Sequence, residues 1–181
     1  MQYIQGDMKR KCRYLLLLLI LCLLNMGPAA AKKIHNRQYH FKIRVPATLC
    51  KINDTAGGVT GEVYYDSAAG IVFMISDLQG RYRSVDEYID CTNAELENRI
   101  KELYGDPALT LYSCSRSEYY PQKMKSLHFG VSVLPGGFDE NIVYFIHHRG
   151  KDIQFSFTYR HKASQAGIKY ISDIVESLKL K

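Results

Sequence analysis

The feature that most constrains the fold of this chain is a pair of apolar runs, separated by a glycine turn, in residues 141–160. The second run alternates, with polar residues between Ile153, Phe155, Phe157 and Tyr159. A period of two is that of a strand with one buried face. Gly150 supplies the positive φ of a tight reversal, so the segment predicts a β-hairpin. Because a hairpin alone is marginally stable in water, further strands and a helix must cover its apolar face.

Five other segments have the composition of strands. They are residues 40–45, 62–66, 71–75, 109–115 and 127–133. The first alternates and ends at Pro46, which has no backbone donor with which to continue a strand. The third is an unbroken apolar run, which suits a central strand. We expect the first three to pair in chain order as a meander, with the glycine-rich residues 53–61 forming a loop.

Two segments have the spacing of amphipathic helices. The longer one begins at Ser84, where Glu87 completes a predicted capping box, and ends at Gly105. The second begins at Ser164 and carries apolar residues at helical spacing as far as Leu178. Strands and helices do not alternate one to one, which favours an antiparallel sheet over a parallel one. The predicted fold class is α+β: an antiparallel sheet of about six to seven strands, with a long central helix and a C-terminal helix packed on it.

The N-terminal segment has the order of a secretory signal peptide. Four basic residues between positions 9 and 13 precede the uncharged residues 15–24, and three alanines end at Ala31. The apolar run is shorter than the ~20 residues of a spanning helix, although an uncleaved anchor remains the alternative. We therefore predict a signal peptide in residues 1–31 with cleavage after Ala31, a basic lead-in in residues 32–37 and one domain in residues 38–181. The mature protein would be secreted or periplasmic, with no membrane span.

The charge of the chain bears on its class of partner, and its cysteine content bears on disulfide formation. Cleavage would lower the formal net charge from +6 to +3, and the mature chain has no Lys/Arg-rich cluster typical of nucleic-acid binding. We therefore expect no nucleic-acid partner. Cys50, Cys91 and Cys114 remain after cleavage, and in an oxidising compartment they allow one disulfide and one unpaired thiol. The sequence leaves all three pairings open.

Motifs for catalysis or cofactor binding are not found in the sequence. The segment 130–134 resembles a nucleophile elbow but lacks its second glycine, and neither a phosphate-binding loop nor a His-Glu-x-x-His motif occurs. None of the three cysteines lies in a Cys-x-x-Cys pair. We therefore assign no residue to catalysis, to a cofactor or to a metal.

One group of polar side chains is a candidate ligand or partner face. If Leu127 and Phe129 face the same side as Ile142 and Tyr144, alternation places five polar residues together on the opposite face. They are His128, His147, Arg149, Gln154 and Arg160.

The simplest interpretation of this face is that it is only the solvated side of the sheet. Two functional uses are the alternatives. Two histidines can bind a transition metal, but no carboxylate is evident beside them. Val143 and Phe145 among the cations could instead hold an anionic ligand or an acidic partner segment.

The order of these elements resembles that of the PsbP-like α/β/α sandwich family. The matching features are a strand at 41–46 that opens the domain, a capped helix after the third strand, a hairpin that ends in residues 152–159, and a closing helix at 171–178. The resemblance covers residues 38–181. The family includes an extrinsic lumenal subunit of the oxygen-evolving complex, a small Ran-binding import factor and many bacterial envelope proteins.

The resemblance implies an accessory or binding module that contacts a protein partner or an anionic ligand, and it transfers no site residue. Two alternatives remain. One is a small metal-dependent or hydrolytic enzyme. The other is a structural envelope component that uses a sheet edge or the Tyr119-Tyr120 loop.

Overall fold

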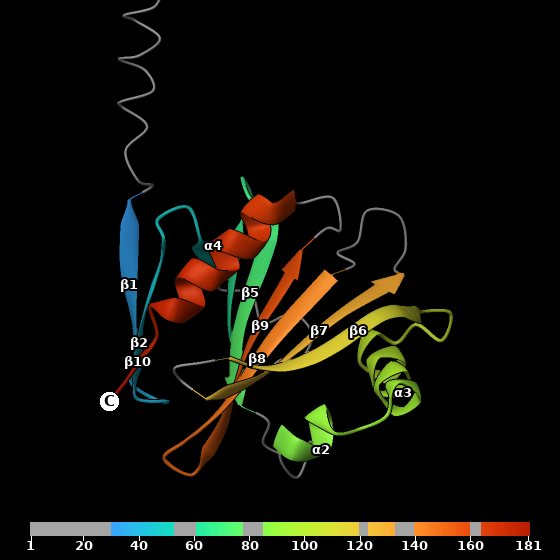
Figure 1. Cartoon of the computed structure of the whole chain (residues 1–181). Helices are drawn as coiled ribbons and strands as arrows, with labels where there is room; N and C mark the ends of the chain where they lie inside the picture. The colour runs from blue at the N-terminus through green and yellow to red at the C-terminus, as the bar shows by residue number, and fades with distance from the viewer. Residues whose placement is uncertain (1–29, 53–60, 78–84, 120–122, 133–139, 160–163) are drawn as a thin grey trace, which may run out of the picture.

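The computed structural model describes residues 30–52, 61–77, 85–119, 123–132, 140–159 and 164–181. The larger of its two sheets has seven antiparallel strands in the order β3-β4-β5-β9-β8-β7-β6. These strands are β3 (Cys50–Ile52), β4 (Gly61–Asp66), β5 (Ile71–Asp77), β6 (Thr110–Tyr119), β7 (Met124–Ser132), β8 (Glu140–His148) and β9 (Lys151–Tyr159). A second sheet and a helix cover one face, and two helices cover the other (Figure 1). The predicted α+β class with an antiparallel sheet is confirmed.

The predicted hairpin is present and occupies the middle of the large sheet. β8 and β9 pair from Glu140 with Tyr159 to His148 with Lys151. Arg149 and Gly150 form the two-residue loop, with φ of 52° and 72°. Positive φ at both central positions is typical of the type I′ turn, whose twist matches that of the flanking strands. β9 also pairs with β5, so the hairpin joins two meanders into one sheet.

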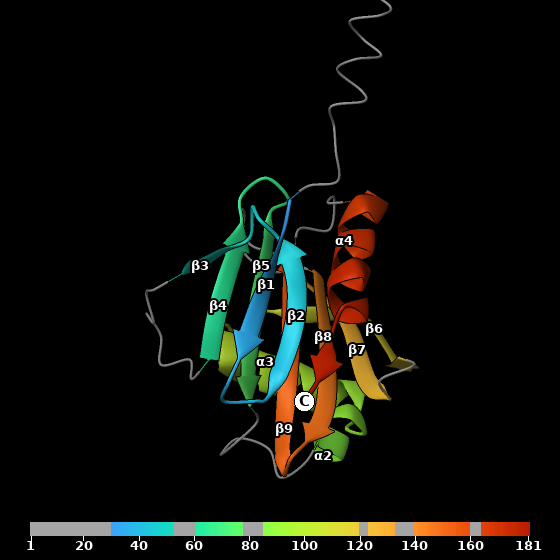
Figure 2. The ribbon, with the colours of Figure 1, turned by 90° about the vertical axis from the view of Figure 1, so that its left-hand side faces the viewer.

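A three-stranded sheet covers one face of the large sheet. It consists of β1 (Ala31–Asn36), β2 (Phe41–Pro46) and β10 (Lys179–Leu180), with β2 in the centre. Figure 2 shows this sheet in front of the large one, with α4 (Ser164–Glu176) beside it. The two layers enclose an aromatic core, in which the Phe41 and Phe155 rings lie 5.2 Å apart and those of Phe73 and Phe157 lie 4.5 Å apart.

Two predictions for the N-terminal part of the domain are wrong. The basic lead-in predicted at 32–37 is largely strand β1, which pairs with β2 in the register Ile34 with Ile43. β2 therefore lies in the small sheet, and the short strand β3 takes its expected place beside β4. The alternation of β2 was interpreted correctly, since Phe41 and Ile43 are each 1% exposed. Periodicity identifies the buried side of a strand but does not identify its neighbour.

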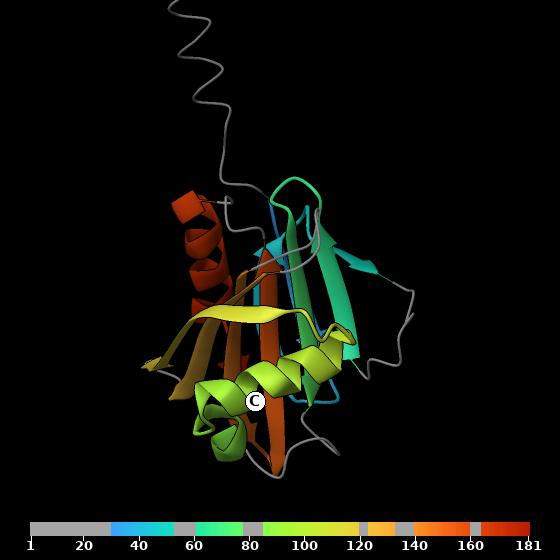
Figure 3. The same ribbon diagram turned by 90° about the vertical axis from the view of Figure 1, so that its right-hand side faces the viewer.

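The predicted long helix is two helices that cover the other face of the large sheet. They are α2 (Val85–Ile89) and α3 (Asn93–Tyr104) (Figure 3). Thr92 separates them, because its hydroxyl accepts from the Glu95 backbone N–H and the Glu95 carboxylate accepts from the Thr92 N–H. This is a complete capping box, and it competes with the one predicted at Ser84, which lies outside the described residues. α3 ends at Gly105 in a left-handed conformation, as predicted.

Asp66 joins the turn between β4 and β5 and the segment after β2 to α4. Its carboxylate accepts hydrogen bonds from the Thr48 hydroxyl at 2.6 Å, the Tyr170 hydroxyl at 2.8 Å, and the backbone N–H groups of Ala68 and Ala69 at 3.0 Å. Burial alone would raise the pKa of Asp66, but these four donors together outweigh it and hold the pKa below its ordinary value. The side chain is almost fully buried, so the ionised form stabilises the folded state.

We expect Asp66→Asn to lower the free energy of unfolding by about 1–3 kcal/mol at pH 7, because a buried charged acceptor is replaced by a weaker one. Since the folded pKa is lowered, the contribution of Asp66 is fully present above its unfolded pKa of about 3.9 and is lost as the pH falls through the folded value. Urea unfolding from pH 7 to pH 2 should show the gap between the two proteins closing in acid. A gap that stayed constant would contradict this account.

The positions of the cysteines select one of the three pairings. Cys50 lies on β3 and Cys114 on β6, the opposite edges of the large sheet and about 29 Å apart across six strand spacings. Cys91 lies between α2 and α3, next to β6, where the Arg116 guanidinium donates to the Cys91 carbonyl at 2.8 Å. Cys91 and Cys114 both pack against the core beneath the helices.

In an oxidising compartment we therefore expect any intramolecular disulfide to join Cys91 and Cys114, because Cys50 lies beyond the 7 Å Cα separation that a bridge allows. Mass spectrometry of a non-reduced digest measures this directly. A linked peptide that contains Cys50 and either other cysteine of the same chain would contradict the fold.

Candidate functional site

The predicted face of five residues is not formed as one surface. The register pairs His128 on β7 with Ile142 on β8, so His128 lies on the side of the aromatic core. His147 and Gln154 belong to the opposite face, because β8 and β9 pair Phe145 with Gln154 and His147 with Asp152. Arg149 is in the hairpin turn and Arg160 is outside the described residues. The grouping of His128 with His147 is therefore wrong.

The error has a simple physical cause. The prediction placed Leu127 on the same side as Ile142, but Leu127 is opposite Val143, and a shift of one residue exchanges the faces of a strand. Both faces of the large sheet are covered, so both sets of apolar residues are buried. Val143 and Phe145 are 2% and 1% exposed and cannot contribute to a surface patch.

His147 and His128 each bind a carboxylate of their own. His147 lies 2.7 Å from Asp152 in an exposed pair near the hairpin turn, and His128 lies 3.0 Å from Glu140. Across the part of the chain that the structure describes, no three His, Cys, Asp or Glu residues gather as a metal would require.

Glu140 is the centre of a polar cluster at one end of β8. Glu140 as a whole is 7% exposed, and its carboxylate accepts from the Tyr112 hydroxyl at 2.7 Å. The Tyr159 hydroxyl lies 3.5 Å from the His128 ring. Tyr112 is the extra residue of a β-bulge in β6, between Leu111 and Ser113. The bulge directs its ring across Gly130, where an added Cβ would lie 2.3 Å from the Tyr112 Cζ.

The contacts of the Glu140 cluster join β6, β7 and β8. A buried carboxylate with a histidine and a tyrosine beside it could also move a proton. Satisfying a buried carboxylate is by itself a sufficient reason for the arrangement.

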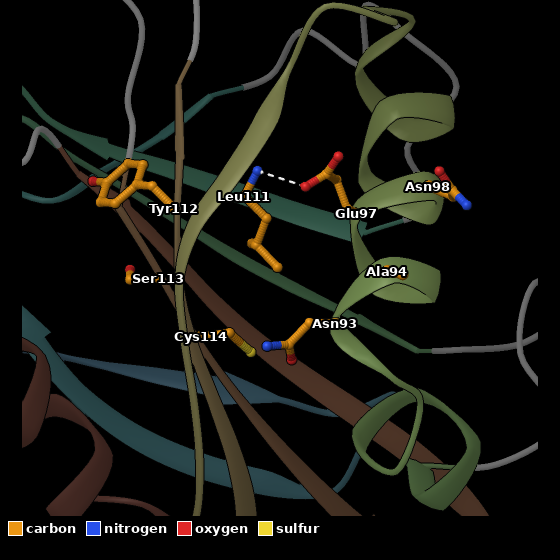
Figure 4. Close-up of a pocket in the computed structure, with 8 residues that line it drawn as sticks. All are labelled: Asn93, Ala94, Glu97, Asn98, Leu111, Tyr112, Ser113 and Cys114. Carbon is orange, nitrogen blue, oxygen red and sulfur yellow. Dashed lines mark hydrogen bonds between the residues drawn. The ribbon is translucent and has the colours of Figure 1, made fainter.

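A pocket of about 310 Å³ lies between α3 and β6 (Figure 4). The Leu111 and Cys114 side chains point toward α3, whereas Tyr112 points to the other side of the strand. The one carboxylate in its lining, Glu97, accepts from the Leu111 N–H at 3.0 Å and from Lys101 at 2.7 Å. Its charge is therefore satisfied within the protein.

The outer face of the small sheet carries a cluster of basic side chains. Cross-strand pairing sets Lys33 beside Arg44, and it sets His35, Lys42 and Lys179 in one row. Because Phe41, Ile43 and Val45 point into the core, these five side chains point outward. We call Lys33, His35, Lys42, Arg44 and Lys179 the basic face.

No carboxylate within the described residues neutralises the charges of the basic face. None of its members forms an ion pair with another residue of the described chain. Partial desolvation and then the charges of Lys42, Lys181 and Lys33 hold the pKa of His35 below its ordinary value. Desolvation and Lys42 likewise lower the pKa of Lys181, at the end of the same sheet. The neighbouring cations thus add to desolvation in lowering both pKa values, as expected of a positively charged surface.

The sequence prediction missed the basic face because residues 32–37 were interpreted as a lead-in. Two signals could have revealed it. Residues 30–52 contain no Asp or Glu, and neither do residues 177–181. Only the fold shows that these distant segments are adjacent strands.

The contact between Tyr112 and Gly130 predicts that substitutions at these two positions affect the free energy of unfolding through the same hydrogen bond. Tyr112→Phe removes a donor from a buried carboxylate and should cost about 1–3 kcal/mol in urea unfolding. Gly130→Ala should displace the half-exposed Tyr112 ring and so break the same hydrogen bond. The double variant should therefore lose little more free energy of unfolding than the less stable of the two single variants. Tyr65→Phe, at an exposed position of β4, is the control and should leave the free energy of unfolding unchanged. Fully additive losses would contradict the coupling.

Comparison with known proteins identifies the fold. No family model and no curated protein matches the sequence. The solution structure of cyanobacterial PsbP (CyanoP) from Synechocystis sp. PCC 6803 matches with a TM-score of 0.62 and 12% identity, over 86% of this chain and 95% of that one. LpqN, involved in cell envelope biogenesis of Mycobacterium tuberculosis, matches with a TM-score of 0.44 and 14% identity, over 86% and 92% of the two chains. The first match shows that this chain has the PsbP-like fold.

Proposed function

We propose that the protein is an accessory binding module outside the cytoplasm, and that it binds an anionic partner through the basic face. The observation that carries the proposal is the unneutralised row of cations on the outer side of the small sheet. The predicted signal peptide supports the location, and the PsbP-like fold is compatible with a non-catalytic role.

The distribution of charge along the chain supports the same function. Residues 30–46 and 177–181 carry seven Lys and Arg side chains and no acid, whereas residues 47–176 carry thirteen basic and seventeen acidic ones. A protein that concentrates its excess of positive charge in this way presents one electropositive side. Such a surface attracts anions and orients them before contact, an effect that added salt weakens.

Retention on an immobilised polyanion such as heparin tests the proposal. We expect the purified exported protein to be retained at low salt, and Lys33→Glu combined with Arg44→Glu to elute at clearly lower salt. Both changes should leave stability almost unaltered, because only the backbone of Arg44 is used structurally, in hydrogen bonds with the Ser177 hydroxyl at 2.7 and 3.2 Å.

The matched control is Lys123→Glu combined with Arg149→Glu, which changes the net charge equally. Both positions are exposed and lie in turns of the large sheet. The control should elute with the parent protein. If the two double variants shift equally, net charge rather than the basic face determines retention and the proposal fails.

A further inference from the structure

We propose that the partner of the basic face is the anionic headgroup surface of a phospholipid bilayer. This inference rests on the proposed function and names its partner. It follows from three features of the chain: the placement of the cations on one side of a sheet, the apolar character of that sheet's other side, and the position of the sheet along the chain.

The cations form a two-dimensional array on the sheet. Lys33 and Arg44 are direct cross-strand neighbours, and Lys42 lies between His35 and Lys179 in the next outward row. Neighbouring strands lie about 4.8 Å apart, so the array presents its charges together on one side. A planar anionic surface can meet all of them at once, whereas a single small anion can meet two or three.

Close approach is possible because nothing described covers the array. α4 packs beside the small sheet, and Ser177, the residue that follows it, binds the β2 backbone. Neither covers the outer side of β1 and β2 (Figure 2). Screening restricts the attraction to about 8 Å at physiological ionic strength, so the array must approach the headgroups directly. Each Lys or Arg at an anionic bilayer then strengthens binding about fivefold.

The position of the sheet along the chain favours a bilayer over an acidic protein. β1 begins at Ala31, and only residues 25–30 separate it from the apolar residues 15–24. Extended chain of that length spans at most about 25 Å. While such an apolar segment is in the membrane, as a signal peptide before cleavage or as an anchor, it would hold β1 close to the headgroups. Nothing comparable in the sequence specifies a protein partner.

Co-sedimentation with vesicles tests the inference. The exported protein, purified from producing cells, is mixed with vesicles of phosphatidylcholine alone or with 30% phosphatidylglycerol. The readout is the ratio of the two partition coefficients, so that any apolar contribution from residues 15–24 cancels. We expect a ratio well above one at 50 mM NaCl that falls toward one at 300 mM.

Two double variants decide where the lipid binds. Lys33→Glu combined with Arg44→Glu should lower the ratio by at least about 25-fold, or to one, because two attractions are lost and two repulsions added. Lys123→Glu combined with Arg149→Glu should leave it unchanged. Equal loss in both variants, or loss in the second alone, would overturn the inference.

The vesicle result also separates this inference from the proposed function. A protein that is retained on heparin through the basic face but whose vesicle ratio is one binds anions other than lipid, which overturns the bilayer inference alone. Suppose that crosslinking captures one acidic protein through the basic face and that the vesicle partition ratio is one. This result would also overturn the bilayer inference, and it would identify a protein as the partner. Failure of both heparin and vesicle binding overturns both proposals.

Discussion

The fold depends on covering both faces of the large sheet, because its strand β8 carries buried apolar side chains on each side. On one face the rings of Phe73 and Phe157 stack at 4.5 Å, and Phe41 from the small sheet closes over Phe155 at 5.2 Å. On the other face Leu96 and Ile100 of α3 pack on β7 and β8. Burial of large aromatic side chains supplies much of the stability of such a core. The small sheet, together with α4, shields the aromatic side of the large sheet from water.

That constraint explains what the sequence could and could not predict. The hairpin of β8 and β9 was predictable because its alternation, its glycine and its length all agree. The side of the sheet on which His128 lies was not predictable, because Ile142 and Val143 are both buried and alternation loses its meaning where both faces are covered. The break at Thr92 was present in the sequence as a second capping box. A continuous apolar stripe concealed it, since Ile89 and Leu96 pack in the same cluster.

The basic face was the part of the candidate site least accessible to sequence reasoning. No local sequence pattern distinguishes Lys33, Lys42 and Lys179. They form one basic surface only because their strands pair, and local patterns do not encode that pairing. Conversely, the four described residues of the group predicted by alternation, His128, His147, Arg149 and Gln154, are divided between two faces and a turn. Local periodicity thus identifies elements well, whereas a surface made of several strands depends on their long-range order.

The small sheet is assembled from both ends of the chain, since β2 lies between β1 and the last strand, β10. Synthesis releases Lys33 about 146 residues before Lys179. The row that contains Lys42 is therefore completed only after β10 has been synthesised and has paired with β2. A chain in which β10 has not yet paired presents an incomplete array, so the complete surface itself reports that the domain has closed.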